Sequence, residues 1–278
     1  MGKNREKMMG FNILKFILGG IFKVYYNPII IGEENIPEKG SMIFVGNHFH
    51  IMDQCLPILS TKRAVHYLAK KEYFDDFKVS WFFKLAGCIP VDRNTKDDLA
   101  TTKALQVLEN GYVLGLFPEG TRNSLKKEKI DQLYTICKSK YPEYKEFVKL
   151  VKGQKTSYLI YIEELISEGI ISENDLIDNV TNINGYLLSL VDKGVISKKD
   201  YDDRLLLPFK FGAVSLAKKT DSYIIPFGIT GEYKFRSKDL VIRIGKPMKV
   251  GDNLEVANKE LAEAVAKLIR IDIKNSGK

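Results

Sequence analysis

Short apolar runs that end in polar turns recur along the first half of this chain, and they constrain its fold more than any other feature. Three of these runs, at residues 41–45, 63–69 and 112–117, are rich in the β-branched and aromatic side chains that strands prefer. Stretches in which apolar residues have helical spacing separate them. Such alternation is typical of an α/β fold. We therefore expect a mixed, mostly parallel sheet flanked by helices.

The segments between these runs predict helices and one more short strand. An amphipathic helix is expected from Lys70 to about Ala86, ended by Gly87, and its expected apolar face contains Phe74, Phe77, Trp81, Phe82 and Leu85. A strand is expected at 88–91. Thr95 to Asp98 has the spacing of a capping box, which predicts the start of a helix over 99–109.

The α/β pattern is interrupted in the second half of the chain. Residues 125–204 are rich in lysine and glutamate and have helical periodicity, after which strands are expected at 223–229 and 240–244 and helices at 213–219 and 254–271. We therefore predict an α/β domain formed by 29–124 and 205–278, with 125–204 as an inserted helical subdomain.

The insert contains an internal repeat, because residues 165–175 match residues 190–200. Each copy predicts a helix, a glycine that ends it, and a serine that caps the next helix. The insert is interpreted as an element that binds a protein partner or covers a site as a lid. Plain structural padding is an equally good interpretation.

The N-terminal segment predicts a helix at a membrane surface. From Met9 to Tyr26 the chain is strongly apolar, with one narrow polar stripe formed by Asn12, Lys15, Gly19 and Lys23. The run is short for a membrane-spanning helix, and its lysines do not suit a signal-peptide core. We expect residues 1–28 to hold a helix that lies in the interface with its lysines toward lipid headgroups. The alternative is a buried helix of the domain.

The composition favours an anionic partner. The chain of 278 residues has a formal net charge of +8, yet it has no zinc-finger motif and no basic stripe interleaved with aromatic residues. A membrane surface or a phosphorylated substrate is therefore favoured over nucleic acid. Three widely spaced cysteines and three histidines argue against a disulfide framework and against a histidine-rich metal centre, so no metal is expected and a reducing cytosolic environment is the simpler interpretation.

Polar residues at the ends of the predicted strands indicate where the chemistry lies. His48 and Asp53 fall on the turn after the strand at 41–45, where an aspartate can orient a histidine that acts as a general base. A solvated turn with a capping aspartate is the alternative. Arg93 follows the strand at 88–91, and Glu119 to Arg122 follow the strand at 112–117. Arginine suits a phosphate because its planar group donates two parallel hydrogen bonds.

Four blocks in this order resemble the glycerolipid acyltransferase family, which includes lysophosphatidic acid acyltransferase. They are Asn47–Asp53, Gly87–Arg93, Phe117–Arg122 and Ile225-Pro226. The resemblance implies that His48 is the general base and that Asp53 orients it. It also implies a group of substrate-binding residues: Arg93 and Arg122 for the acceptor phosphate, Glu119 and Gly120 for its glycerol, Lys70 as a further phosphate contact, Pro226 on the side of the acyl donor, and Thr121 without a more specific role.

The family resemblance also implies a reaction. An acyl chain passes from an acyl thioester, acyl-CoA or acyl carrier protein, to the sn-2 hydroxyl of lysophosphatidic acid, which gives phosphatidic acid in phospholipid biosynthesis without a cofactor. Glycerol 3-phosphate or another lysophospholipid is the alternative acceptor. The enzyme is expected on the cytoplasmic face of a membrane. Family members often have serine where this chain has His50, so His50 is interpreted as a neutral substitution, with a second polar contact as the alternative.

Two other classes of function remain open. The spacing His48-x-His50-x-x-Asp53 is similar to the ligand clusters of metallohydrolases, although His66 is the only further histidine. A lipid-binding scaffold without catalysis, whose insert recruits a partner, is the other alternative.

Overall fold

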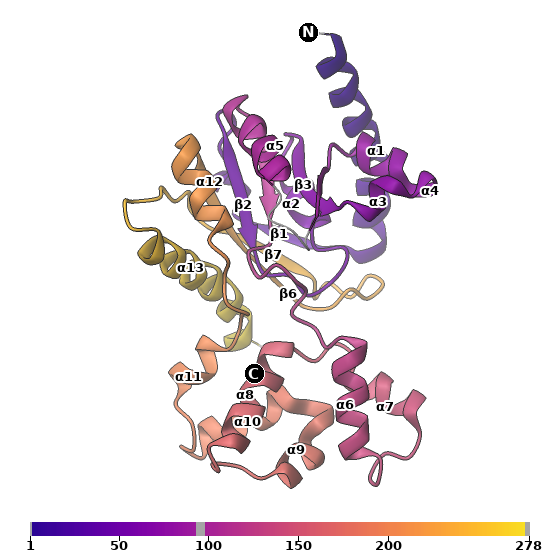
Figure 1. Ribbon diagram of the computed structural model, residues 1–278, viewed down its shortest axis with the longest axis vertical. Coiled ribbons are helices and arrows are strands. Elements are labelled where there is room, and N and C mark those ends of the chain that lie inside the picture. Colours follow the sequence, from indigo (N-terminus) through magenta and orange to yellow (C-terminus); the bar gives the residue numbers. More distant parts are fainter. Residues whose placement is uncertain (1, 93–97, 276–278) are drawn as a thin grey trace. The chain divides into compact units, whose positions relative to one another are not determined.

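In the computed structural model, which describes residues 2–92 and 98–275, the chain divides into two units (Figure 1). Unit 1 consists of Met1–Asn47, Ile51–Gly120 and Phe209–Lys278, and it contains the sheet. Unit 2 consists of His48–His50 and Thr121–Pro208.

The sheet of unit 1 has the strand order β1-β7-β6-β2-β5-β3-β4. Only β6 and β7 pair in antiparallel fashion among the described strands, and the other neighbours are parallel, so the expected mixed, mostly parallel sheet is confirmed. The strands are β1 (Ile29–Ile31), β2 (Met42–Gly46), β3 (Val65–Lys70), β4 (Ile89–Val91), β5 (Val113–Leu116), β6 (Tyr223–Thr230) and β7 (Val241–Ile244).

Helices cover this sheet because its central strands are apolar on both faces. Every residue of β2 is buried, which explains why Met42–Gly46 has a continuous apolar sequence instead of an alternating one. The helices of unit 1 are α1 (Gly2–Tyr26), α2 (Cys55–Ser60), α3 (Glu72–Asp75), α4 (Phe77–Leu85), α5 (Asp98–Glu109), α12 (Gly212–Thr220) and α13 (Leu254–Asn275), with the 3₁₀ turn η1 (Glu33–Asn35).

The carboxyl ends of five strands meet at one edge of the sheet. Strands β2, β3, β4, β5 and β6 run in the same direction, so the turns that leave them lie at this edge. We call it the carboxyl edge. In open α/β sheets this is the edge at which ligands bind.

The single helix expected over 70–86 is wrong. Asp76 has an extended backbone, with φ −80° and ψ 110°, and it divides the segment into α3 and α4. Its carboxylate accepts a hydrogen bond from the backbone N–H of Lys78 at 2.9 Å, so it caps α4. The expected apolar face is also wrong in part, because Phe77 and Trp81 are 82% and 60% exposed. The proposed capping box at residues 95–98 extends outside the described residues.

Helix α1 lies within the expected residues 1–28, but the side that it turns toward unit 1 differs from the expected one. The ammonium of Lys15 donates to the backbone carbonyl of Thr61, and burial, followed by the charge of Lys23, lowers the pKa of Lys15. A Cβ at Gly19 would lie 2.7 Å from Leu59 of α2, so this glycine permits a close approach. Lys15 and Gly19 therefore face the protein, while Asn12 and Lys23 of the same stripe are exposed. The expectation that Lys15 points toward lipid headgroups is wrong.

The opposite face of α1 is apolar and exposed. Its large side chains range from 51% to 83% exposed: Ile13, Phe16, Ile17, Ile21 and Val24. Among the helices that the structure describes, none combines the length and the apolarity needed to cross a membrane.

Residues 121–208, all of which are described, form helices and no strand. The helices are α6 (Lys127–Cys137), α7 (Tyr144–Val151), α8 (Thr156–Ser167), α9 (Glu173–Asn179), the 3₁₀ turn η2 (Val180–Asn182), α10 (Ile183–Asp192) and α11 (Lys198–Asp203). They share an apolar core in which Phe147, Leu159 and Leu187 are fully buried.

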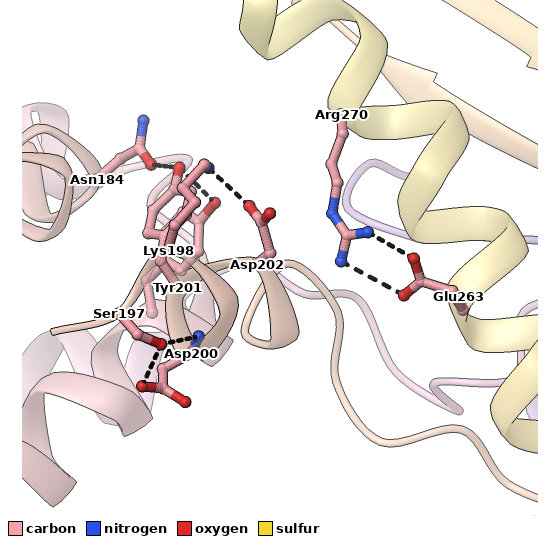
Figure 2. Close-up of polar contacts among 9 residues, drawn as sticks. Asn184, Ser197, Lys198, Asp200, Tyr201, Asp202, Glu263 and Arg270 are labelled. Atoms are coloured by element: carbon pink, nitrogen blue, oxygen red, sulfur yellow. Dashed lines mark hydrogen bonds and ion pairs between the residues drawn. The ribbon is translucent and has the colours of Figure 1, made fainter. Parts of the chain in front are cut away.

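The two copies of the predicted repeat have the same turn between their helices. Gly169 and Gly194 both have φ +70°, a conformation that favours glycine after a helix. Ser172 then caps α9 and Ser197 caps α11, each by accepting from the backbone N–H three residues later. Figure 2 shows the second cap, in which the Ser197 hydroxyl also donates to Asp200 at 2.6 Å. We call Gly169–Ser172 and Gly194–Ser197 the repeat turns.

Candidate active site

Asn47 fixes the carboxyl end of β2. Its side-chain amide donates to the carbonyl of Ile229 at 2.9 Å and accepts from the N–H of the same residue at 2.8 Å. This amide is 5% exposed and joins β2 to β6, its neighbour in the sheet. His48 follows Asn47 directly, so the last residue before the proposed base is held by two buried hydrogen bonds.

Asp53 is fully buried in unit 1, on the turn between β2 and α2. The hydroxyl of Tyr233 donates to its Oδ1 at 2.6 Å, a distance typical of a hydrogen bond to an ionised carboxylate. Burial first, and then the nearby charge of Asp53, raise the pKa of Tyr233, so the phenol remains protonated and keeps donating.

Two thiols belong to the same unit, and the charge of Asp53 affects the first of them, Cys55. Burial raises the pKa of Cys55 to about 12, and the charge of Asp53 adds to the shift. Burial raises the pKa of Cys88 to about 11, although a hydrogen bond from the backbone of Tyr67 opposes it. Because thiolates and not thiols are nucleophiles, neither cysteine is suited to attack a thioester at neutral pH.

The turn after β5 carries Glu119 and Gly120 at the carboxyl edge. Glu119 is 4% exposed. Gly120 has φ +70°, a backbone conformation that favours glycine, and its Cα faces the flexible end of the Lys210 side chain. The backbone N–H of Lys210 donates to the carbonyl of Pro118 at 2.9 Å, which joins this turn to the segment that follows the insert.

Within unit 2, the backbone of His48 is bound to the segment after Arg122. The N–H of Asn123 donates to the carbonyl of His48 at 2.6 Å. The Asn123 side chain is buried and exchanges two hydrogen bonds with Ser157 at the start of α8, both at 2.9 Å. Thr121 is half-buried and Arg122 is exposed. The loop that carries Arg122 is thus anchored on the first of the helices that carry the repeat.

The remaining predicted residues lie at different places. Lys70 is exposed at the carboxyl end of β3, paired in register with Val91 of β4. Arg93 lies outside the described residues. Pro226 is buried inside β6, and its carbonyl accepts from the N–H of Gly245 at 2.8 Å. The roles assigned to these three residues stay predictions.

Unit 1 therefore brings Asp53, Lys70, Glu119 and Gly120 to its carboxyl edge, while His48, Thr121 and Arg122 belong to unit 2. Sequence reasoning did not single out Tyr233, and it gave no role to Asn47 or Asn123 as anchors. Asn47 and Asn123 each adjoin a predicted block, and this adjacency is the signal that identifies them. No local signal marks Tyr233, which is 180 residues from Asp53.

The alternative metallohydrolase interpretation predicts a ligand cluster around His48, His50 and Asp53. Among the residues that the structure describes, no group of three or more His, Cys, Asp or Glu is arranged to hold a metal ion. The arrangement instead provides a buried carboxylate held by a phenol, next to a loop whose backbone favours glycine.

The amino-acid sequence is similar to known proteins over the segments that carry the candidate site. The family model described as Acyltransferase matches residues 27–230. The 1-acyl-sn-glycerol-3-phosphate acyltransferase of Bacillus subtilis (strain 168) is 32% identical over 117 residues, which cover 41% of this chain and 55% of that protein. The protein of the same name from Borreliella burgdorferi is 36% identical over 97 residues, which cover 34% of this chain and 39% of that protein. The matched segments thus span about half the length of these relatives or less.

The fold is similar to that of a solved structure. It is the 1-acyl-sn-glycerophosphate (LPA) acyltransferase PlsC from Thermotoga maritima, which matches with a TM-score of 0.52 over 91% of this chain and 78% of that one. The two sequences are 18% identical over the match. The likeness therefore concerns the arrangement of strands and helices.

Proposed function

We propose that this chain, which belongs to the acyltransferase family, transfers an acyl chain from an acyl thioester to the sn-2 hydroxyl of 1-acyl-sn-glycerol 3-phosphate. The names of the relatives from Bacillus subtilis and Borreliella burgdorferi support this acceptor. One observation carries the proposal: the carboxylate of Asp53 is buried at the carboxyl edge of the sheet, where the Tyr233 hydroxyl holds it. Asp53 lies in the block that carries the family's histidine and aspartate.

The proposed chemistry needs a base because an alcohol is a weak nucleophile at neutral pH. His48 takes the proton of the acceptor hydroxyl while its oxygen attacks the thioester carbonyl. Asp53 orients the imidazole and stabilises the imidazolium ion, as the aspartate of a serine protease does. When the carbon–sulfur bond breaks, the leaving thiolate receives this proton. The raised pKa values of Cys55 and Cys88 are consistent with direct transfer, without an acyl-enzyme intermediate.

The acceptor needs cations for its phosphate and polar groups for its glycerol. Arg93 and Arg122 are proposed for the phosphate, with Lys70 as a further contact. Glu119 and Gly120 are proposed around the glycerol, and Thr121 as a further substrate-binding residue. Gly120 has no side chain and lies beside the end of the Lys210 side chain, so its backbone is proposed to lie close to the glycerol.

The acyl donor is proposed to be acyl-CoA or an acyl carrier protein, and no cofactor takes part. Pro226 is assigned to the donor side by the family resemblance. Glycerol 3-phosphate and other lysophospholipids are the alternative acceptors, because they offer the same phosphate and a similar hydroxyl.

The exposed face of α1 supports a location at a membrane surface, which is proposed to be the cytoplasmic face as the family resemblance implies. Helix α1 turns Lys15 toward the protein and turns Phe16, Ile17 and Ile21 outward, which is the reverse of a helix on a soluble surface. The exposed Phe77 of α4 adds to this surface. Such a surface matches substrates that reside in lipid.

A matrix of substrates tests the reaction. Purified protein is incubated with lysophosphatidate, glycerol 3-phosphate or lysophosphatidylcholine, each with palmitoyl-CoA or palmitoyl acyl carrier protein, and products are identified by mass spectrometry. We expect phosphatidate from lysophosphatidate at the highest kcat/KM. Preference for another acceptor would replace the proposed substrate, and absence of an ester product with every pair would refute the enzymatic function.

Vesicle binding tests the location. We expect Phe16→Glu to reduce sedimentation with phosphatidylglycerol vesicles by about tenfold, because it places a charge on the exposed apolar face. Gln106→Glu adds the same charge at an exposed position of α5 and is the matched control. Equal binding by both variants would exclude this face as the membrane contact.

A further inference from the structure

Tyr233 connects the proposed catalytic carboxylate to a loop that no motif marks. The loop between β6 and β7 turns back sharply, with positive φ at Gly231, Arg236 and Lys238. At Gly231 a Cβ would collide with the backbone of Asp239, so the loop requires glycine to close. Tyr233 reaches from this loop to Asp53, where its hydroxyl donates at 2.6 Å.

The last two turns of α1 hold this loop in place. The N–H of Arg236 donates to the carbonyl of Tyr25 at 2.8 Å, which satisfies one of the free carbonyls at the end of the helix. The ring of Tyr233 meets the ring of Tyr26 edge-on at 5.5 Å and that of Phe22 at 6.3 Å. Phe22 is 4% exposed, so these rings form a packed cluster.

The same helix therefore has two faces with separate tasks. Phe22 lies on the face toward the protein and packs against Tyr233, while Phe16 and Val24 lie on the exposed apolar face, at 83% and 70% exposed. A shift of α1 moves the rings that support Tyr233, and the hydrogen bond to Asp53 follows them. The position of α1 is thus mechanically connected to the orientation of the carboxylate.

We propose that Tyr233 is a positioning residue for acyl transfer: it holds Asp53 in the orientation that the base requires, and Phe22 and Tyr26 of the membrane-facing helix hold Tyr233. This inference rests on the proposed function, since it assigns Tyr233 a role in that same reaction. Tyr233 acts through Asp53 and contacts neither substrate.

Tyr233→Phe tests the hydroxyl alone, because it preserves the ring that packs on α1. A hydrogen bond to a charged group contributes enough that we expect kcat to fall by about tenfold. KM for both substrates is expected to change by less than about twofold, because no substrate contact is lost. Tyr223→Phe makes the same change at an exposed tyrosine, the first residue of β6, and is the matched control.

A double-mutant cycle tests the connection to α1. Phe22→Leu keeps an apolar side chain and removes the ring contact, so we expect kcat to fall by about threefold while vesicle binding is unchanged. If Phe22 acts through the Tyr233 hydroxyl, the double variant has the kcat of Tyr233→Phe alone. A kcat reduced by the product of the two single effects would show independent roles and overturn the coupling.

The failure of this inference is distinguishable from failure of the proposed function. If the wild type forms no ester product, the function itself is refuted. If the wild type is active but Tyr233→Phe keeps its kcat, Tyr233 has no positioning role. A rise of KM with unchanged kcat would also overturn it, because it would indicate a substrate contact.

Discussion

At the carboxyl edge of the sheet, polar side chains are buried and bonded to residues far away in sequence, whereas in the repeat turns they are exposed and bonded locally. Asn47 bonds to Ile229 across 182 positions, and Tyr233 bonds to Asp53 across 180. Ser197 bonds to Asp200 across three positions, at the surface (Figure 2). Since a buried polar group that loses its partner is costly and an exposed one is solvated by water, the two regions should respond very differently to substitution.

The largest effect on stability is expected at Asn47. Asn47→Ala leaves both the N–H and the carbonyl of Ile229 without their side-chain partner, so we expect the free energy of unfolding to fall by about 3 kcal/mol. Urea denaturation followed by circular dichroism measures it. Asn110→Ala, which removes an exposed contact to Gln106 within the same unit, is the control and should cost well under half as much. Equal losses would remove the distinction between buried and exposed amides.

The next effect is a loss of stability at alkaline pH that originates beside Asp53. The pKa of Cys55 is raised from 9.0 to about 12. Its contribution to stability is therefore complete below pH 9 and is lost as the pH rises toward 12. By pH 10.5 we expect a loss of about 2 kcal/mol from this thiol. Denaturation curves at pH 8 and pH 10.5 measure it, and Cys55→Ala should reduce the decline. An unchanged decline in that variant would assign it to other groups.

The serine caps of the repeat turns should contribute less. Ser172→Ala and Ser197→Ala each remove one exposed capping bond, so we expect each to lower the free energy of unfolding by about 1 kcal/mol. The two losses should agree closely because the turns share one geometry. A loss at one serine and none at the other would show that the two turns share a backbone geometry but contribute differently to the free energy of unfolding.

The smallest effect is expected at the ion pair between Lys198 and Asp202. The two groups are 2.7 Å apart, but the lysine side chain is 54% exposed. Solvent and salt screen such pairs, so Lys198→Ala should cost less than about 0.5 kcal/mol. A cost above 1 kcal/mol in the same denaturation assay would show that this exposed ion pair contributes as much to stability as a buried hydrogen bond at the carboxyl edge.

The strands of the sheet were predicted where burial makes them continuously apolar. The runs at 41–45, 112–117 and 223–229 correspond closely to β2, β5 and β6. Strand β1 was not predicted, because three isoleucines carry no periodicity and their pairing with β7 depends on residues more than 200 positions away. The break at Asp76 was also missed, since the apolar spacing continues across it.

Sequence also identified the polar blocks better than their surroundings. The blocks that carry His48, Asp53 and Glu119 could be recognised because each follows a predicted strand. The orientation of α1 could not, because the sequence reveals two faces of a helix but not which one packs on the protein. Tyr233 could not be found either, because its role arises only when the β6–β7 loop folds back on α1.

The rate of acyl transfer by His48→Ala tests the central claim most directly. If His48 is the general base of acyl transfer, its loss should lower kcat by about a thousandfold. Circular dichroism and urea denaturation should show the wild-type fold and stability. A correctly folded His48→Ala protein that retains activity within about tenfold of the wild type would contradict the mechanism.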